Sequence, residues 1–137
     1  MEKINTIAIF DIGKTNKKFF LLNESYNIVL EKTVQFAEIE DEDGDACEDV
    51  LLLTNWVQST IREALQLPEF NIRAVNFSTY GASFVYLDES GAVVAPLYNY
   101  LKDYPSGLRE QFYERYGGTL KISLETASPV LGNLNSG

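Results

Sequence analysis

Charged and polar side chains gather in one short stretch near the start of the chain, Asp11-Ile12-Gly13-Lys14-Thr15-Asn16-Lys17-Lys18. Its hydroxyl, amide, ammonium and backbone N–H groups can donate to phosphate oxygens, and the Asp11 carboxylate can hold Mg²⁺ directly or through water. The lysines concentrate positive charge in a chain whose net charge is −9. These residue types suit a phosphate site. A plain hairpin, in which Asp11 bonds the turn and the lysines keep the tip soluble, accounts for the same residues.

The triplet Gly13-Lys14-Thr15 also ends the P-loop pattern G-x-x-x-x-G-K-[ST], in which successive backbone N–H groups wrap a nucleotide phosphate. That pattern requires a second glycine at the position that Ala8 occupies. The dinucleotide pattern G-x-G-x-x-G does not occur either, and an apolar run typical of a strand follows where that fold needs a helix. The sequence excludes both loops and leaves a strand-turn-strand hairpin.

The elements that must position this hairpin are predicted from hydrophobic patterning. Residues 7–10 are apolar throughout, which is typical of a central strand covered on both faces. Residues 19–22 and 28–36 predict two further strands, each reached by a short turn. Short connections between successive strands favour an antiparallel meander, so the hairpin is expected to join its first two strands.

A helix and a crossover strand are predicted next. Asp45-Ala46-Cys47-Glu48 has the spacing of a capping box, so the helix is expected to begin there, and apolar residues recur at helical spacing to about Leu67. Trp56 lies on the apolar face and is expected in the core. Residues 72–81 predict a strand, which the preceding helix makes a parallel crossover. The sequence therefore predicts an α/β fold with a mixed sheet.

The second half of the chain has weaker patterns. Residues 83–94 predict a pair of strands joined by a turn at Glu89-Ser90-Gly91. Residues 106–116 predict a second helix, which Gly117-Gly118 closes. Residues 126–137 show no periodicity and are left without a predicted element.

Two other groups of residues have alternative interpretations. In Asp41-Glu42-Asp43-Gly44-Asp45 the glycine comes too early for an EF-hand loop, so a solvated loop or helix cap is favoured over a metal site. Tyr98, Tyr100 and Tyr104 could stack on a sugar ring, although irregularly spaced tyrosines are more typical of a half-buried loop.

Composition limits the functions open to the chain. It has 137 residues, 45% of them apolar and 23% charged, which is typical of one soluble globular domain. A net charge of −9 argues against a nucleic-acid partner. Because histidine is absent and Cys47 is the single cysteine, a disulfide within the chain and most transition-metal or Ser-His chemistry are excluded. No apolar run suits a signal peptide or membrane span, so we expect a cytoplasmic protein without a membrane partner.

The stretch FDIGKTNKK resembles the first phosphate motif, D-x-G-T-[TS]-x-x-[RK], of the FGGY carbohydrate kinases within the actin-like ATPase superfamily. Asp11, Gly13, Thr15 and Lys18 match this motif, whereas Lys14 replaces a small hydroxyl residue. The resemblance implies ATP and Mg²⁺ as cofactors, with Mg²⁺ at Asp11, directly or through water. The residues that it implies for the ATP phosphates and Mg²⁺ are Asp11, Gly13, Lys14, Thr15, Asn16 and Lys18.

A second stretch, STYGASFVYLDESG, resembles D-T-W-G-V-D-F-V-L-L-D-x-x-G in the rhamnulokinase branch of that family. Ser78 and Ser83 replace residues that are often Asp there, and YNYLKD replaces a sugar-contacting Y-R-D-x-R segment. The substrate is therefore left open among ketoses such as rhamnulose, fuculose and xylulose, or a polyol. In the family this segment lies near the sugar, so the resemblance implies substrate contacts from Ser78, Thr79, Tyr80 and Gly81.

The resemblance implies a ribonuclease-H-like (actin-like ATPase) fold, in which residues 1–137 are the first part of the N-terminal domain, without its remainder or the second domain. It places Glu48 or Asp49 on the sugar side, and the catalytic base and adenosine pocket beyond residue 137. We expect an ATP-dependent carbohydrate kinase whose 137-residue piece is inactive alone and self-associates through uncovered sheet edges. Two alternatives remain open: an actin-like or chaperone-like ATPase, and a non-catalytic nucleotide- or sugar-binding module.

Overall fold

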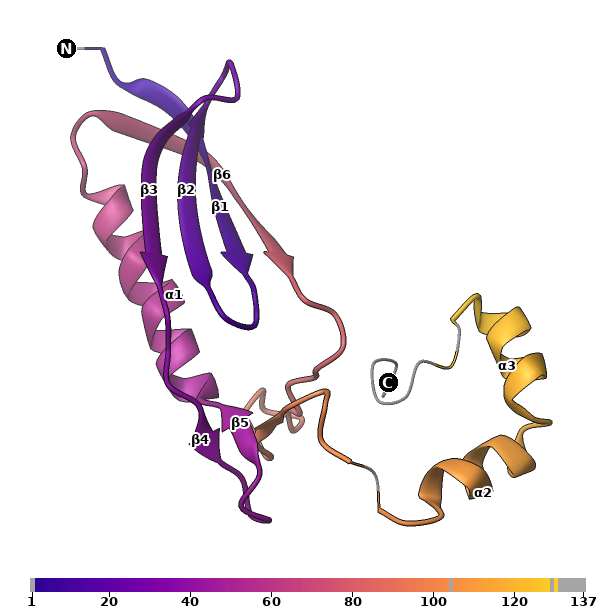
Figure 1. The fold of residues 1–137 in the computed structure, drawn as a ribbon. Coiled ribbons are helices and arrows are strands. Elements are labelled where there is room, and N and C mark those ends of the chain that lie inside the picture. The colour runs from indigo at the N-terminus through magenta and orange to yellow at the C-terminus, as the bar shows by residue number, and fades with distance from the viewer. Residues whose placement is uncertain (1, 104, 129, 131–137) are drawn as a thin grey trace. The chain divides into compact units, whose positions relative to one another are not determined.

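A computed structural model of the chain describes residues 2–103, 105–128 and 130, and these form two compact units (Figure 1). Unit 1 holds the described residues within Met1–Ile39 and Glu48–Gly81, and unit 2 holds those within Glu40–Cys47 and Ala82–Gly137. The chain therefore passes between the units more than once, and each unit is described by itself.

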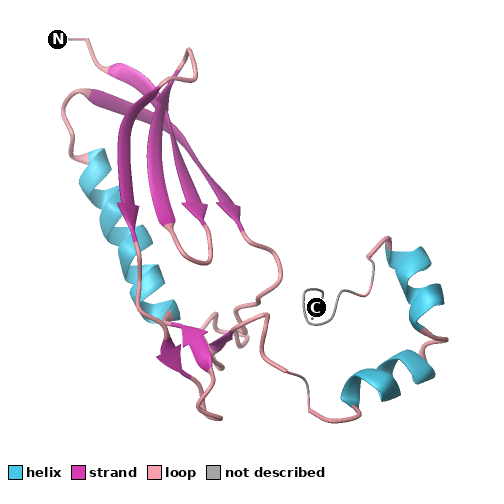
Figure 2. Ribbon diagram, viewed as in Figure 1, coloured by secondary structure: helices cyan, strands magenta, loops and turns pink. Residues whose placement is uncertain are grey.

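The strands of unit 1 form one four-stranded mixed sheet, in the order β3-β2-β1-β6 (Figure 2). The pairs β1–β2 and β2–β3 are antiparallel, whereas β6 runs parallel to β1. This arrangement confirms the predicted meander and parallel crossover strand. The strands are β1 (Ile4–Ile12), β2 (Lys17–Asn23), β3 (Ile28–Val34) and β6 (Phe70–Thr79).

One helix, α1 (Val50–Leu65), packs against this sheet and closes its core. The Phe10 ring lies at the centre, 4.9 Å from the ring of Phe19, 5.4 Å from Trp56 and 5.1 Å from Phe77, measured between ring centroids. Trp56 therefore packs in the core as predicted. The prediction that residues 7–10 are covered on both faces is wrong for the described chain, because Ile7 is 39% exposed on the face opposite α1.

The predicted start of the helix is also wrong. Ala46–Glu48 form a short strand, β5, so these residues cannot supply the first helical turn. The N-cap is Asp49, whose carboxylate accepts a hydrogen bond of 2.9 Å from the backbone N–H of Leu52. A strand pairing between distant residues thus overrides the local capping-box pattern.

Unit 2 holds a small three-stranded sheet and two short helices. The sheet has the order β4 (Ile39–Glu40), β5, β7 (Leu97–Tyr98). Helix α2 (Leu108–Arg115) confirms the second predicted helix, and α3 (Thr119–Thr126) was not predicted. Leu120 and Leu124 are 73% and 75% exposed, so α3 lacks the buried face that produces a helical pattern.

The strand pair predicted over residues 83–94 is wrong. Only an isolated bridge, Leu87 to Val93, is present there, and it closes around a turn in which the Asp88 carboxylate accepts from the backbone N–H groups of Ser90 and Ala92. The predicted turn is confirmed. The flanking residues Phe84 and Val85 are exposed, so burial does not extend the bridge into a ladder.

Cys47, in β5, has a buried side chain and forms no disulfide. Within the described ranges, no helix combines the length and the hydropathy needed to cross a bilayer. Residues 131–137, in the segment left without a predicted element, lie outside the described part of the chain.

Candidate functional site

The turn between β1 and β2 is closed by backbone atoms at Gly13. Its N–H donates to the carbonyl oxygen of Asn16 at 3.0 Å. A Cβ added to Gly13 would lie 2.9 Å from that oxygen, closer than side-chain carbons approach backbone. Glycine is therefore needed for this close approach. Because its N–H is used within the turn, Gly13 shapes the loop and is not itself a free donor to a ligand.

The register of the sheet brings three predicted residues into one row. Asp11 on β1 lies opposite Lys18 on β2 and opposite Ser78 on β6. Because side chains alternate along a strand and Phe10 faces α1, this row lies on the other face of the sheet. Lys18 Nζ is 3.8 Å from Glu31 Oε1 on β3. The first motif and the start of the second thus meet at the ends of β1 and β6.

Lys17 belongs to the next row, on the face of α1, and its side chain is 2% exposed. Its ammonium donates to the Lys14 carbonyl oxygen at 2.6 Å and lies 3.0 Å from Glu48 Oε2. The other oxygen of Glu48 accepts from the Tyr80 hydroxyl at 2.9 Å. Lys17 is therefore part of a buried network and does not add to the exposed positive charge of the turn, as its grouping with the other lysines suggested.

The other polar residues of the turn lie beside the segment that follows β3. Lys14 Nζ is 2.5 Å from Glu38 Oε1, and Gln35 Nε2 donates to Asn16 Oδ1 at 2.7 Å. Thr15 and Asn16 are exposed at the tip of the turn. The structure therefore brings Lys14, Thr15 and Asn16 together at one turn, with two of their side chains already bonded to the chain itself.

The predicted substrate residues continue from the end of β6. The Tyr80 N–H donates to the Ile12 carbonyl oxygen at 3.3 Å, and Thr79 Oγ1 donates to the Tyr80 carbonyl oxygen at 2.7 Å. Ser78, Thr79 and Gly81 are exposed. Of this predicted set, Tyr80 has its hydroxyl bonded to Glu48, which leaves Ser78 and Thr79 as the more accessible hydroxyls.

Sequence reasoning missed the structural role of Lys17 and the contacts of Glu38 and Gln35. A signal for Lys17 was present, because residues 17, 19 and 21 alternate in one phase and Phe19 and Leu21 are core residues. No spacing rule connects Lys14 to Glu38, since that contact depends on where the chain goes after β3.

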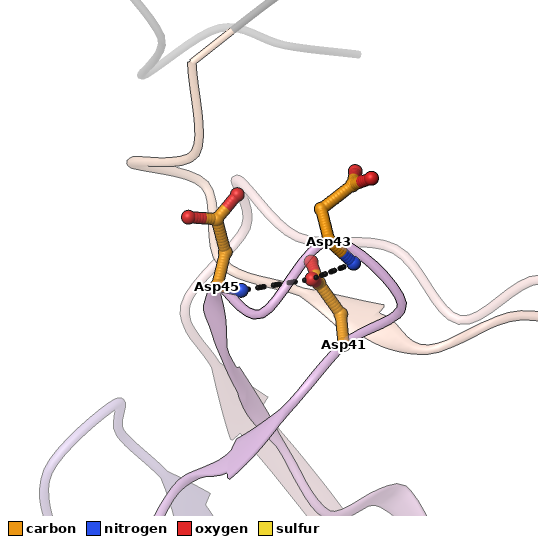
Figure 3. A group of neighbouring side chains, drawn as sticks. All are labelled: Asp41, Asp43 and Asp45. Carbon is orange, nitrogen blue, oxygen red and sulfur yellow. Dashed lines mark hydrogen bonds between the residues drawn. The ribbon is translucent and has the colours of Figure 1, made fainter.

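Unit 2 holds a separate charged cluster, in which Asp41, Asp43 and Asp45 converge (Figure 3). The Asp41 carboxylate accepts from the backbone N–H groups of Asp43 and Asp45 at 2.9 and 3.0 Å. Lys102 Nζ lies 2.5, 2.8 and 3.4 Å from the three carboxylates in turn. These bonds lower the pKa of Asp41 and raise the pKa of Lys102. The acidic loop is thus an ion-paired turn, not simply a solvated one.

A cavity of about 360 Å³ also lies within unit 2. Aromatic, amide and charged side chains share its wall. A hydrogen bond from the Tyr98 hydroxyl to Glu42 raises the pKa of Tyr98 to about 12. Tyr104, which the sequence grouped with these tyrosines, lies outside the described residues. The residues that line the cavity include Tyr86, Tyr98, Asn99, Tyr100 and Lys102.

Comparison with known sequences found one curated relative, a rhamnulokinase from Mannheimia succiniciproducens. It is 25% identical over 118 residues, which are 83% of this chain and 24% of the relative. No family model matches the chain. The chain thus spans about a quarter of the length of the relative that it matches.

Solved kinase structures share the fold. A carbohydrate kinase from Novosphingobium aromaticivorans matches with a TM-score of 0.74 and 18% identity, over 93% of this chain and 26% of its own. A ligand-bound xylulose kinase from Lactobacillus acidophilus matches with a TM-score of 0.71 and 21% identity, over 88% of this chain and 24% of its own. A glycerol kinase from Plasmodium falciparum with ADP matches with a TM-score of 0.65 and 15% identity, over 88% of this chain and 25% of its own. The mixed α/β fold of this chain is therefore shared with part of these kinases, in agreement with the predicted fold class.

Proposed function

We propose that this chain belongs to a protein of the FGGY carbohydrate kinase family. The sequence relative and the shared fold support this proposal. The chain supplies part of an ATP-dependent carbohydrate kinase, which transfers a phosphoryl group from MgATP to a hydroxyl of a sugar or polyol. The observation that carries this proposal is the row of Lys18, Asp11 and Ser78, because it brings the phosphate motif and the start of the sugar motif to the same edge of one sheet.

The β1–β2 turn is the proposed phosphate site. Asp11 is half-buried and supplies the hard carboxylate oxygens that Mg²⁺ prefers, so it fits the ion directly or through water. Bound Mg²⁺ would neutralise charge on the phosphates during transfer. Lys14, Thr15, Asn16 and Lys18 are the proposed phosphate donors, and Gly13 holds the turn in shape.

The proposed sugar contacts are the residues after β6. Ser78 and Thr79 offer exposed hydroxyls, Gly81 offers backbone, and Tyr80 is held by Glu48. Taken by itself, the cavity of unit 2 has tyrosine faces of a kind on which the apolar side of a sugar ring stacks. The named relatives differ in the substrate that their names give, so the proposal covers a ketose such as rhamnulose, fuculose or xylulose, or a polyol.

We also propose that residues 1–137 correspond to the first part of the N-terminal domain and are inactive alone. Phosphoryl transfer to a hydroxyl requires a group that accepts the hydroxyl proton, in line with the phosphate. The family resemblance puts that base beyond residue 137, and the chain spans about a quarter of its relatives. We expect binding of MgATP without sugar-dependent ADP release.

Calorimetric titration of MgATP into the chain tests the phosphate site. Asp11→Asn is expected to weaken MgATP binding about tenfold or more, because it removes the proposed Mg²⁺ ligand. Glu89→Gln is the matched control, since Glu89 is an exposed acid of unit 2. Equal affinity of the Asp11→Asn variant and the control would refute the site.

An assay of ADP release separates the remaining alternatives. Turnover that depends on a sugar would contradict inactivity of this piece alone. Turnover without sugar would favour the actin-like or chaperone-like ATPase. Binding of MgATP without either activity agrees with the proposed fragment, and a chain extended to the length of the relatives then distinguishes a kinase from a non-catalytic binding module.

A further inference from the structure

One ion pair at the proposed phosphate site has no counterpart in the motif. Lys14 Nζ lies 2.5 Å from Glu38 Oε1, and the two side chains are 28% and 43% exposed. Lys14 is also the residue that departs from the motif, which has a small hydroxyl at this position. The pair therefore adds a positive and a negative charge to the turn at the same time.

The segment that carries Glu38 is held on the turn by further contacts. Gln35 Nε2 donates to Asn16 Oδ1 at 2.7 Å. The Lys17 ammonium lies 5.9 Å from the centre of the Phe36 ring, and that ring also packs edge-on against Trp56 at 6.2 Å. Since Phe36 is fixed against the core, Glu38 is presented to Lys14 by an ordered backbone.

We propose, on the basis of the proposed phosphate site, that Glu38 is an internal counter-ion of Lys14 that a phosphate ligand displaces. Both groups sit in one half-exposed location, and an ammonium ion paired closely with a carboxylate presents less positive potential to an incoming anion. A polyphosphate carries several negative charges, whereas Glu38 carries one, so the polyphosphate displaces the Glu38 carboxylate from the Lys14 ammonium. Glu38 therefore weakens phosphate binding and keeps Lys14 in place while the site is empty.

The opposite role for Glu38 makes the opposite prediction. If Glu38 held Lys14 in the orientation that binds phosphate, its removal would free a long flexible side chain and weaken binding. If Glu38 instead competes with phosphate, its removal strengthens binding. The sign of the effect of one substitution thus distinguishes the two roles.

Titration of inorganic tripolyphosphate with Mg²⁺ into the 137-residue chain is the direct test. Glu38→Gln is expected to bind about two- to fivefold more tightly than the unmodified chain, the range that an exposed ion pair supports. Glu38→Asp, which keeps the carboxylate, is expected to return toward the unmodified affinity. Glu40→Gln is the matched control, because it makes the same change of charge at an exposed residue close by in the sequence.

A double variant isolates the pair itself. Lys14→Thr is expected to weaken tripolyphosphate binding, and Glu38→Gln added to Lys14→Thr is expected to have no more effect than Glu40→Gln. Glu38→Ala repeats the test with a second side chain, and circular dichroism checks that each variant is folded. If Glu38→Gln binds no more tightly than Glu40→Gln, the inference fails and the phosphate site stands. If no variant binds tripolyphosphate, the phosphate site fails and this inference fails with it.

Discussion

At the scale of single residues, the side chains of the β1–β2 hairpin divide between structure and chemistry. Gly13 and Lys17 are used within the fold, the first by its backbone and the second by its buried ammonium. Asp11, Thr15 and Lys18 keep side chains that a ligand can reach. Residues that look alike in sequence, such as Lys17 and Lys18, therefore have opposite roles because they face opposite sides of the sheet.

Replacement of Lys17 by Met is expected to destabilise unit 1 strongly. The substitution leaves the Glu48 carboxylate, which is 11% exposed, without its cation, and breaking a buried pair in this way costs about 3–5 kcal/mol. Lys32→Met is the control, because Lys32 pairs with Glu63 on the surface at 2.7 Å and is expected to change the free energy of unfolding by less than about 1 kcal/mol. Denaturant unfolding followed by Trp56 fluorescence measures both, and equal effects would contradict the network.

The Tyr98 hydroxyl is expected to lose its proton at a higher pH than an ordinary tyrosine. Its hydrogen bond to Glu42 favours the neutral phenol and raises its pKa from 10.0 to about 12. The stabilisation of unit 2 by this bond is therefore complete below pH 10 and is lost as the pH rises through about 12. Glu42→Gln should move the pKa of Tyr98 back toward 10.0, as seen in tyrosinate absorbance. Tyr98→Phe identifies the titration step, and a spectrum unchanged by Glu42→Gln would show that the bond is not formed.

At the scale of elements, α1 shows which features local sequence patterns predict and which they do not. The apolar spacing from Val50 onward predicted the helix, and short apolar runs joined by turns predicted β1 to β3, because each pattern is complete within its own element. The start of α1 was missed since β5 pairs with distant strands. The row that joins Asp11 to Ser78 could not be predicted either, because strand register is set by packing over the whole sheet.

Asp49, and not Asp45, is the N-cap of α1. Asp49→Ala removes the acceptor for the Leu52 N–H and should lower the free energy of unfolding of unit 1 by about 1 kcal/mol. Asp45→Ala should leave the unfolding of unit 1 nearly unchanged, because Asp45 lies in the Lys102 cluster of unit 2. Trp56 fluorescence during denaturation reports unit 1, and a larger effect of Asp45→Ala would restore the capping-box interpretation.

At the scale of the whole molecule, β6 is an edge strand with exposed apolar side chains. Val75 is 45% and Phe77 is 51% exposed, and strands of this kind pair readily with other chains. We expect self-association that grows with protein concentration in sedimentation velocity. Val75→Lys should reduce it, whereas Leu51→Lys, which adds the same charge at an exposed apolar residue of α1, should not. A monomer at all concentrations would contradict this expectation.

Two residues that occur once in the chain lie in different units. Trp56 packs against Phe10 in unit 1, and Cys47 is buried in unit 2. The sequence therefore carries one intrinsic reporter for each unit: indole fluorescence follows the first, and the rate at which a thiol reagent reaches the Cys47 sulfur follows opening of the second. Without any engineered label, the two signals can reveal whether the halves of this chain unfold as one cooperative body or separately.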